Sequence, residues 1–484
     1  MRPPATQTGS PLSLQANALA FSSVLMQGVT HIAPAVGLVL SLQFVVVMAG
    51  AASPLAFAIA LLIVLLLGVC LCQLARHLPS AGGYYTYISH TLHPRAGFLT
   101  AWMFFLYDPL TAAVNLAFMG FLLQATLRLE AGLNCPWYVI FLAAALFITV
   151  LTYRGIEISA GIMVGLTVIE ILIIGALALA SLAHPGDGGL QVQSFTALHN
   201  FRHKGLYLAI VFAIFSFTGF ESVAPLAEET RDPRRVLPRA ILLSIALMGI
   251  FFVGGSWAVL TGWGSNHIEG FANSAENPIF VLAKRLWGGA WVFVVIAVVN
   301  SILGASIAGT NASTRVFFAM GRARSLPSAL ASIHPRFRTP VNAILLQTFI
   351  TLAIGLGVGF WIGPDQEYYF LGVAMTLGLL CIYAAGNVGV FVYYRNRRRA
   401  EFNVWFHLIF PLLSTLSLVW VFYRSVVPLP DPPLRYAPLL VAAWLLAGLL
   451  LLCTGRGASL VPLGPLALAP AAGAAPSGVN SRHG

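Results

Sequence analysis

The chain has 484 residues, of which 58% are hydrophobic and only 8% are charged, and its mean hydropathy is +0.86. Soluble domains carry about 25% charged residues, so this composition excludes an ordinary soluble protein and favours a chain that lies mostly in a lipid bilayer. The formal net charge of +11 comes mainly from arginines in short connections between apolar segments, which indicates control of membrane topology rather than nucleic-acid binding.

Long apolar segments recur along the whole chain. A segment of about 18 or more apolar residues can cross a bilayer as a helix. The N-terminal residues show no cleavage site of a signal peptide, so we expect the first segment to remain in the protein. The pattern predicts an all-α polytopic membrane protein with twelve spanning helices, near residues 18–48, 54–78, 95–126, 136–153, 157–183, 206–229, 236–262, 288–319, 340–361, 368–394, 403–424 and 436–454.

Basic residues are distributed unevenly between the two sides of these helices. If the N-terminus is cytoplasmic, 19 of the 26 lysines and arginines lie on the cytoplasmic side and 7 on the other. Cytoplasmic connections of membrane proteins are enriched in these residues. We therefore expect both termini in the cytoplasm, with a polar tail over 1–16 and a mobile tail over 456–484.

Two of the predicted helices are interrupted in the middle. The first contains QGVTHIAP at 27–34 and the sixth contains FSFTGFE at 215–221. Proline removes a backbone donor, and glycine loosens a helix. Helices 1 and 6 are corresponding members of two five-helix halves, and interruptions at matching positions of two halves point to a transporter site near the middle of the membrane. An ordinary kink in each helix is the alternative.

A broken helix offers free backbone groups to a ligand. The N–H groups near Ala33 to Val36 suit a carboxylate, and the carbonyls near Phe215 to Thr218 suit an ammonium group. An amino acid carries both groups, so no charged side chain is needed for binding. The residues predicted to bind substrate are Thr30, His31, Ile32, Ala33, Pro34, Ala35, Asp108, Phe215, Ser216, Phe217, Thr218 and Gly219.

Three segments resemble motifs of one transporter family. The sixth helix and its exit, FSFTGFESVAPLAEETRDPRRVLPRAI, resemble the F-x-G-x-E … E-x-x-x-P-x-R-x-x-P-x-A-I stretch of the amino acid–polyamine–organocation permeases. The loop LPSAGGYYTYISHTLHPRAGFLTAW and the segment NASTRVFFAMGRARSLP resemble two further motifs of that family. The resemblance covers roughly residues 15–425, and the loop after the sixth helix is its most specific part.

The resemblance implies a fold and a mechanism. The fold is a LeuT-like 5+5 inverted repeat with discontinuous helices 1 and 6, followed by two more helices. The mechanism is alternating access with proton-coupled uptake or exchange. The chain departs from the family at the G-x-G motif of helix 1, where Thr30-His31-Ile32-Ala33-Pro34-Ala35 stands instead, and this departure bears on the substrate class.

Three residues are candidates for coupling and gating. Glu170 lies midway along the fifth helix, where a carboxyl group is costly and usually functional; we expect it to carry a proton, the alternative being a neutral, hydrogen-bonded acid. Glu221 follows Thr218 at the spacing of a capping box; it can cap the second half-helix and can also couple the movement of that half-helix to binding, since the two roles are compatible. By the resemblance, Phe215 is a gating aromatic that closes over the substrate; plain packing is the alternative.

Other polar and aromatic residues allow two interpretations each. Asp108 precedes a proline in the third helix and either attracts an amine or bonds to a neighbouring helix. His31 lies within the first interruption, and because histidine has an ordinary pKa of about 6.5, it is either a proton carrier or a neutral hydrogen-bonding group. The cluster of Tyr84, Tyr85 and Tyr87 is typical of an anchor at the membrane surface.

The sequence therefore predicts a secondary active transporter of amino acids in the plasma or inner membrane. The alternatives are a polyamine or cationic-amine transporter and an amino acid exchanger; a membrane enzyme is remote, because no metal set, P-loop or nucleophile elbow is recognisable. The expected partners are a small substrate, protons and lipid, with no metal, cofactor or nucleic acid, in a monomer or weak homodimer. A ten-helix transport core is predicted over 17–395, and helices 11 and 12 over 396–455.

Overall fold

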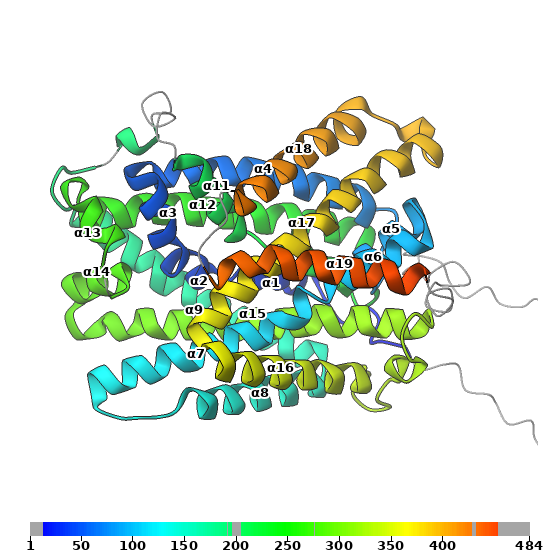
Figure 1. The fold of residues 1–484 in the computed structure, drawn as a ribbon, viewed down its shortest axis with the longest axis horizontal. Helices are drawn as coiled ribbons and strands as arrows, with labels where there is room; N and C mark the ends of the chain where they lie inside the picture. Colours follow the sequence, from blue (N-terminus) through cyan, green and yellow to red (C-terminus); the bar gives the residue numbers. More distant parts are fainter. Residues whose placement is uncertain (1–12, 191, 196–204, 275, 428–431, 454–484) are drawn as a thin grey trace, which may run out of the picture.

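The computed structural model describes residues 13–190, 192–195, 205–274, 276–427 and 432–453, and every regular element within them is a helix. Twelve helical segments in these ranges are long and apolar enough to cross a membrane. This confirms the predicted all-α polytopic fold (Figure 1). The predicted tail over 456–484 and most of the tail over 1–16 lie outside the described residues.

The first predicted span consists of three helical pieces. They are α1 (Phe21–Ile32), α2 (Pro34–Val39) and α3 (Ser41–Ala49). The chain then turns at Gly50, whose φ of 56° favours glycine. It returns as the second span, α4 (Ser53–Ala75).

The third span is broken as well, although we predicted one continuous helix over 95–126. It consists of α6 (Pro94–Phe104) and α7 (Asp108–Ala131), which are separated by three residues that end at Tyr107. Proline at the second position of a helix suits a helix start, so Asp108-Pro109 begins a new helix instead of bending an old one. The other α-helices before residue 190 are α5 (Tyr84–Thr91), α8 (Trp137–Arg154) and α9 (Ile156–Ala183).

The chain after residue 205 again contains both long spans and short helical pieces. Two short helices, α13 and α14, follow the seventh span and were not predicted, because each alone is too short for a bilayer signal. The helices are α11 (Leu206–Phe215), the 3-10 helix η3 (Phe220–Glu228), α12 (Pro233–Trp263), α13 (Ile268–Ala272), α14 (Pro278–Trp287), α15 (Val292–Arg322), α16 (Val341–Ile362), α17 (Pro364–Asn396), the π-helix η8 (Trp405–Ile409), α18 (Phe410–Val426) and α19 (Ala437–Cys453).

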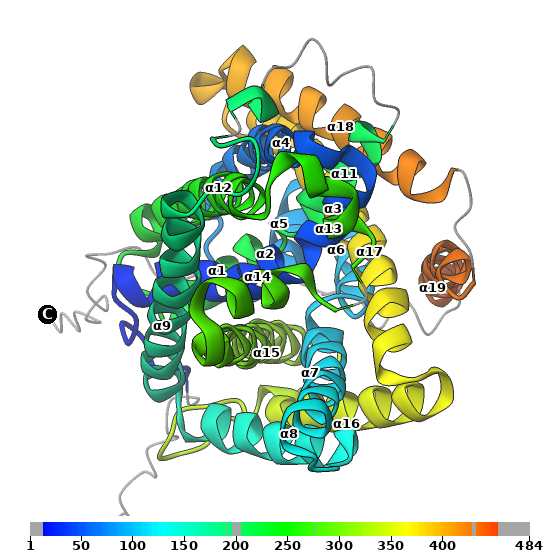
Figure 2. The same cartoon turned by 90° about the vertical axis from the view of Figure 1, so that its left-hand side faces the viewer.

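Helix α1 lies in the interior of the bundle. It packs against α9, α12, α15 and η3, and Figure 2 shows α1 and α2 surrounded by the long spans while α19 lies at the edge. The last six residues of α1 are all buried, including the polar Gln27, Thr30 and His31. Since lipid offers such groups no hydrogen bonds, a polar segment in the centre of the bundle marks the region where a site can form.

The tyrosine cluster is not a membrane-surface anchor, so that prediction is wrong. Tyr85 and Tyr87 are 2% and 0% exposed. The ring of Tyr84 lies 6.0 Å from that of Tyr383 on α17. Helix α5 packs between α6 and α17, so its tyrosines line the inside of the bundle.

Candidate functional site

The first span is interrupted at Ala33, as the sequence predicts. Ala33 adopts the left-handed conformation, with φ of 58° and ψ of 73°, which few residues other than glycine adopt. Its N–H donates to the carbonyl of Thr30 at 3.1 Å, and Pro34 has no N–H to donate. The helix therefore ends at Ile32 and a new one begins at Pro34.

The sixth span is interrupted at the predicted place too. Helix α11 ends at Phe215, and η3 begins at Phe220 after a turn that includes Gly219, whose φ is 120°. A Cβ atom on Gly219 would lie 2.7 Å from the carbonyl carbon and oxygen of His31 and 2.9 Å from the nitrogen of Ile32. The two interruptions are therefore in direct backbone contact, and only glycine permits that approach.

Glu221 secures the second half of the broken sixth span. Its Oε2 atom accepts a hydrogen bond from the N–H of Gly219 at 3.1 Å and another from the hydroxyl of Tyr383 at 2.6 Å. The predicted capping box with Thr218 is wrong, because the Thr218 hydroxyl donates back to the carbonyl of Phe215 at 2.9 Å. The cap forms one residue later, where the helix begins.

Tyr383 is a functional candidate that the sequence did not reveal. It lies 162 residues from Glu221 within the apolar helix α17, where no motif surrounds it. Its bond to Glu221 joins α17 to the sixth span. Only the three-dimensional packing of two distant spans brings these side chains together.

Glu170 forms a hydrogen bond with the backbone just after the break in the first span. Its Oε2 atom accepts a hydrogen bond from the N–H of Ala35 at 3.2 Å, and Ser301 Oγ accepts one from the N–H of Val36 at 3.3 Å. Glu170 is 0% exposed. The donors that we expected to hold a substrate carboxylate therefore have protein partners in this structure.

Asp108 and His31 form a second buried group. The Nε2 atom of His31 lies 3.5 Å from Oδ1 of Asp108, and both side chains are buried. The ring of Tyr107 lies 6.1 Å from that of His31. The separation of 3.5 Å exceeds that of a good hydrogen bond, and neither Asp108 oxygen has a hydrogen-bond partner among the described residues.

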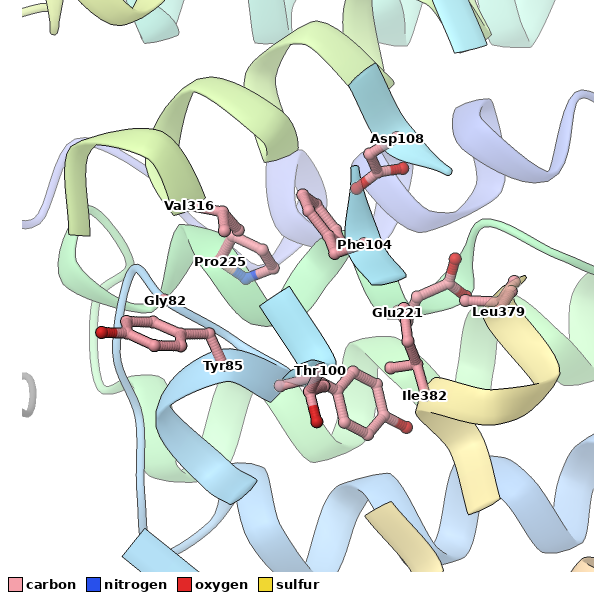
Figure 3. Close-up of a pocket in the computed structure, with 11 residues that line it drawn as sticks. Gly82, Tyr85, Thr100, Phe104, Asp108, Glu221, Pro225, Val316, Leu379 and Ile382 are labelled. Carbon is pink, nitrogen blue, oxygen red and sulfur yellow. The ribbon is translucent and has the colours of Figure 1, made fainter. Parts of the chain in front are cut away.

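Asp108 and Glu221 both line one small cavity. Asp108 and Glu221 lie at one end and Gly82 and Tyr85 at the other (Figure 3). Its volume is about 20 Å³, which holds about one water molecule. An amino acid therefore needs a wider arrangement of the surrounding spans. The cavity is lined by Gly82, Tyr84, Tyr85, Thr100, Phe104, Asp108, Glu221, Pro225, Val316, Leu379 and Ile382.

The other predicted site residues lie near the two breaks, but some of them bond to or pack against neighbouring helices instead of lining the cavity. Thr30 shares a hydrogen bond with Thr167 of α9. Phe217 is buried against Phe252 of α12, with ring centroids 5.1 Å apart, so it belongs to the core rather than to the cavity. Phe215 is only half-buried and faces Gly372 of α17. Ile32, Ser216 and Ala35 are buried at the breaks.

The sequence matches the model of a known protein family. The family model for amino acid permeases matches residues 23–459, which include every span except parts of the first. The chain is a member of the amino acid permease family. Its membership agrees with the resemblance found in the motifs and makes it a multi-pass membrane transporter.

Several known transporters are similar to the chain. The low-affinity putrescine importer PlaP of Escherichia coli is 25% identical over 76% of this chain and 80% of its own length. The serine/threonine exchanger SteT of Bacillus subtilis is 24% identical over 74% and 78%. The branched-chain amino acid permease BcaP of Bacillus subtilis is 28% identical over 61% and 65%.

Proposed function

We propose that this permease is a proton-coupled secondary transporter that binds an amino acid or a related amine between the broken halves of its first and sixth spans. The contact of Gly219 with the backbone of His31 and Ile32 carries the proposal. Paired discontinuous helices at mid-membrane are the usual construction of a transporter site. The relatives that carry putrescine or amino acids support this class of substrate.

Alternating access requires that one end of the bundle close while the other opens. In this structure two ion pairs join the end of η3, at Glu228 and Glu229, to helix α15. Glu228 binds Arg322 through contacts of 2.6 and 2.9 Å, and Glu229 binds the buried Arg315 through contacts of 2.8 and 3.1 Å. These bidentate pairs are directional, so we expect them to break when this end opens.

Glu170 supplies the coupling in this proposal. An ionised carboxylate forms hydrogen bonds about twice as strong as those of a neutral group. Protonation of Glu170 therefore weakens its bond to the N–H of Ala35 and loosens α2 from α9. The uptake of a proton is in this way linked to the movement of the broken first span.

The substitution Glu170→Gln tests the coupling. The amide keeps the size of the side chain but cannot exchange a proton. We expect the variant in proteoliposomes to lose accumulation driven by a pH gradient while it keeps exchange of labelled for unlabelled substrate. Glu157→Gln on the same helix is the matched control, because Glu157 is exposed and bonds only to Gln15 among the described contacts.

Two results contradict the proposal at different levels. If Glu170→Gln still accumulates substrate in response to a pH gradient, Glu170 has no role in the coupling, while the proposed transport stands. No uptake of any amino acid or amine by the unmodified protein, in either direction of the gradient, rejects transport of this class altogether.

A further inference from the structure

Asp108 has unused hydrogen-bonding capacity in a buried place. The side chain is 1% exposed, and neither of its oxygens has a hydrogen-bond partner among the described residues. A carboxylate offers about four acceptor positions. The closest basic group is the imidazole of His31 at 3.5 Å. Buried acceptors of this kind normally have a hydrogen-bond donor. Asp108 has none among the described residues, so a ligand can supply it.

A second carboxyl group faces the same cavity. The Oε1 atom of Glu221 has no hydrogen-bond partner within the described part of the chain, although Oε2 is bonded. Figure 3 shows Asp108 and Glu221 near each other at one end of the cavity. No lysine or arginine lines this cavity, and the buried Arg315 is bound to Glu229. The surroundings favour a positive charge.

The backbone N–H groups that could bind a negative charge already have partners in the protein. At the start of α2, the N–H of Ala35 is bonded to Glu170 and that of Val36 to Ser301. The N–H of Ala33 is bonded to the carbonyl of Thr30, and proline supplies none. Because a neutral Glu170 still has an acceptor oxygen, the N–H of Ala35 keeps a partner in both protonation states. A carboxylate on the substrate would find no free donor here and would meet acidic side chains.

We infer that the substrate is an aliphatic amine that carries no carboxylate, and that Asp108 binds its ammonium group. This inference rests on the proposed function and narrows its substrate class. An ammonium group has three donors and no acceptor, which complements the unpartnered oxygens of Asp108 and Glu221. The carboxyl group of Glu170 occupies the position that the carboxylate of an amino acid would otherwise take.

Matched pairs of ligands test the inference directly. Cadaverine differs from lysine, and putrescine from ornithine, by the loss of one carboxylate. We expect each amine to raise the melting temperature of the purified full-length protein, as a ligand of the native state does, and to compete for uptake in proteoliposomes. The parent amino acids should require concentrations at least about tenfold higher.

Substitutions assign the roles within the site. Asp108→Asn should abolish the thermal shift by both amines, whereas Glu269→Gln, an exposed acid on α13, should keep it. Glu170→Ala frees the N–H of Ala35 and should allow lysine to stabilise the protein. This gain of binding does not depend on whether the Asp108 variant folds.

The possible outcomes separate the two proposals. If lysine and ornithine bind as well as the amines do, the inference is wrong while the proposed transport stands. If Asp108→Asn folds and still binds the amines, Asp108 is not the ammonium site. If neither the amines nor any amino acid binds or is taken up by the unmodified protein, the proposed function fails together with the inference.

Discussion

Gly219 makes the closest backbone contact between the two broken spans, and its replacement tests the site at the scale of one residue. Gly219→Ala places a Cβ atom 2.7 Å from the carbonyl of His31 at a φ of 120°. Strained backbone of this kind costs about 1–3 kcal/mol, so we expect substrate affinity to fall by roughly tenfold or more. Binding is measured by thermal shift or by saturation of uptake.

Gly254→Ala is the control, because no atom lies within 4 Å of the added Cβ on helix α12. Alanine in a helix interior stabilises by about 0.5–1 kcal/mol relative to glycine. The control should therefore bind substrate normally and melt slightly higher. Equal affinity in Gly219→Ala and the unmodified protein would contradict a site at this contact.

Single residues were predictable where they broke a strong rule of membrane sequences. Glu170 stood out as a lone carboxyl group in an apolar helix, and Gly219 as part of a helix break; the structure places both at the broken spans. Their partners Ser301 and Tyr383 were not predictable, since a serine or tyrosine is unremarkable in a membrane helix. Partnership depends on which distant spans pack together, and a single sequence does not contain that information.

The ends of η3 and α15 are joined by an ion pair, and the proposed closing of this end gives a prediction at the scale of elements. Glu228, at the end of η3, binds Arg322 and accepts the N–H of Ala81 at 3.1 Å. A partly exposed ion pair is worth up to about 1 kcal/mol, or roughly fivefold in a conformational equilibrium. We expect Glu228→Gln to raise by that factor the rate at which a cysteine at Thr100, which lines the cavity, is modified from this end.

Arg398→Gln provides a matched control for the closure. It breaks the pair of Arg398 with Glu401, whose two side chains are 42% and 41% exposed and lie three residues apart. A pair within one loop joins no separate spans, so labelling at Thr100 should not change. Equal labelling rates in Glu228→Gln and Arg398→Gln would show that the contact with Arg322 does not hold this end closed.

Spans were predictable from hydropathy because lipid requires long apolar helices, but their interruptions were predictable only in part. The breaks at Pro34 and Gly219 combine several helix-breaking residues within a few positions. The break before Asp108 has proline alone as its signal, and a proline is common in membrane helices. The short helices α13 and α14 carry no bilayer signal, so only the structure shows them.

The whole molecule has a strong asymmetry of charge, with 19 of its 26 basic residues on the side that we assign to the cytoplasm. If all twelve candidate spans cross the membrane, the two ends of the chain lie on the same side, and from the rule of positive cytoplasmic connections we expect that side to be the cytoplasm. The arrangement of the spans alone does not decide it, because a bundle of helices is compatible with either orientation.

Two native cysteines test this orientation without disturbing the protein. Cys135 lies in the connection after the third span, and the exposed Cys453 ends the twelfth, so an odd number of crossings separates them. Cys70 and Cys72 are buried and should not react.

We expect a membrane-impermeant maleimide to label Cys135 on intact cells and to label Cys453 only after permeabilisation, as read by mass spectrometry. A Cys135→Ser variant should lose the first signal. Labelling of Cys453 on intact cells would reverse the orientation, and the end that contains the pair of Glu228 and Arg322 would then face the outside.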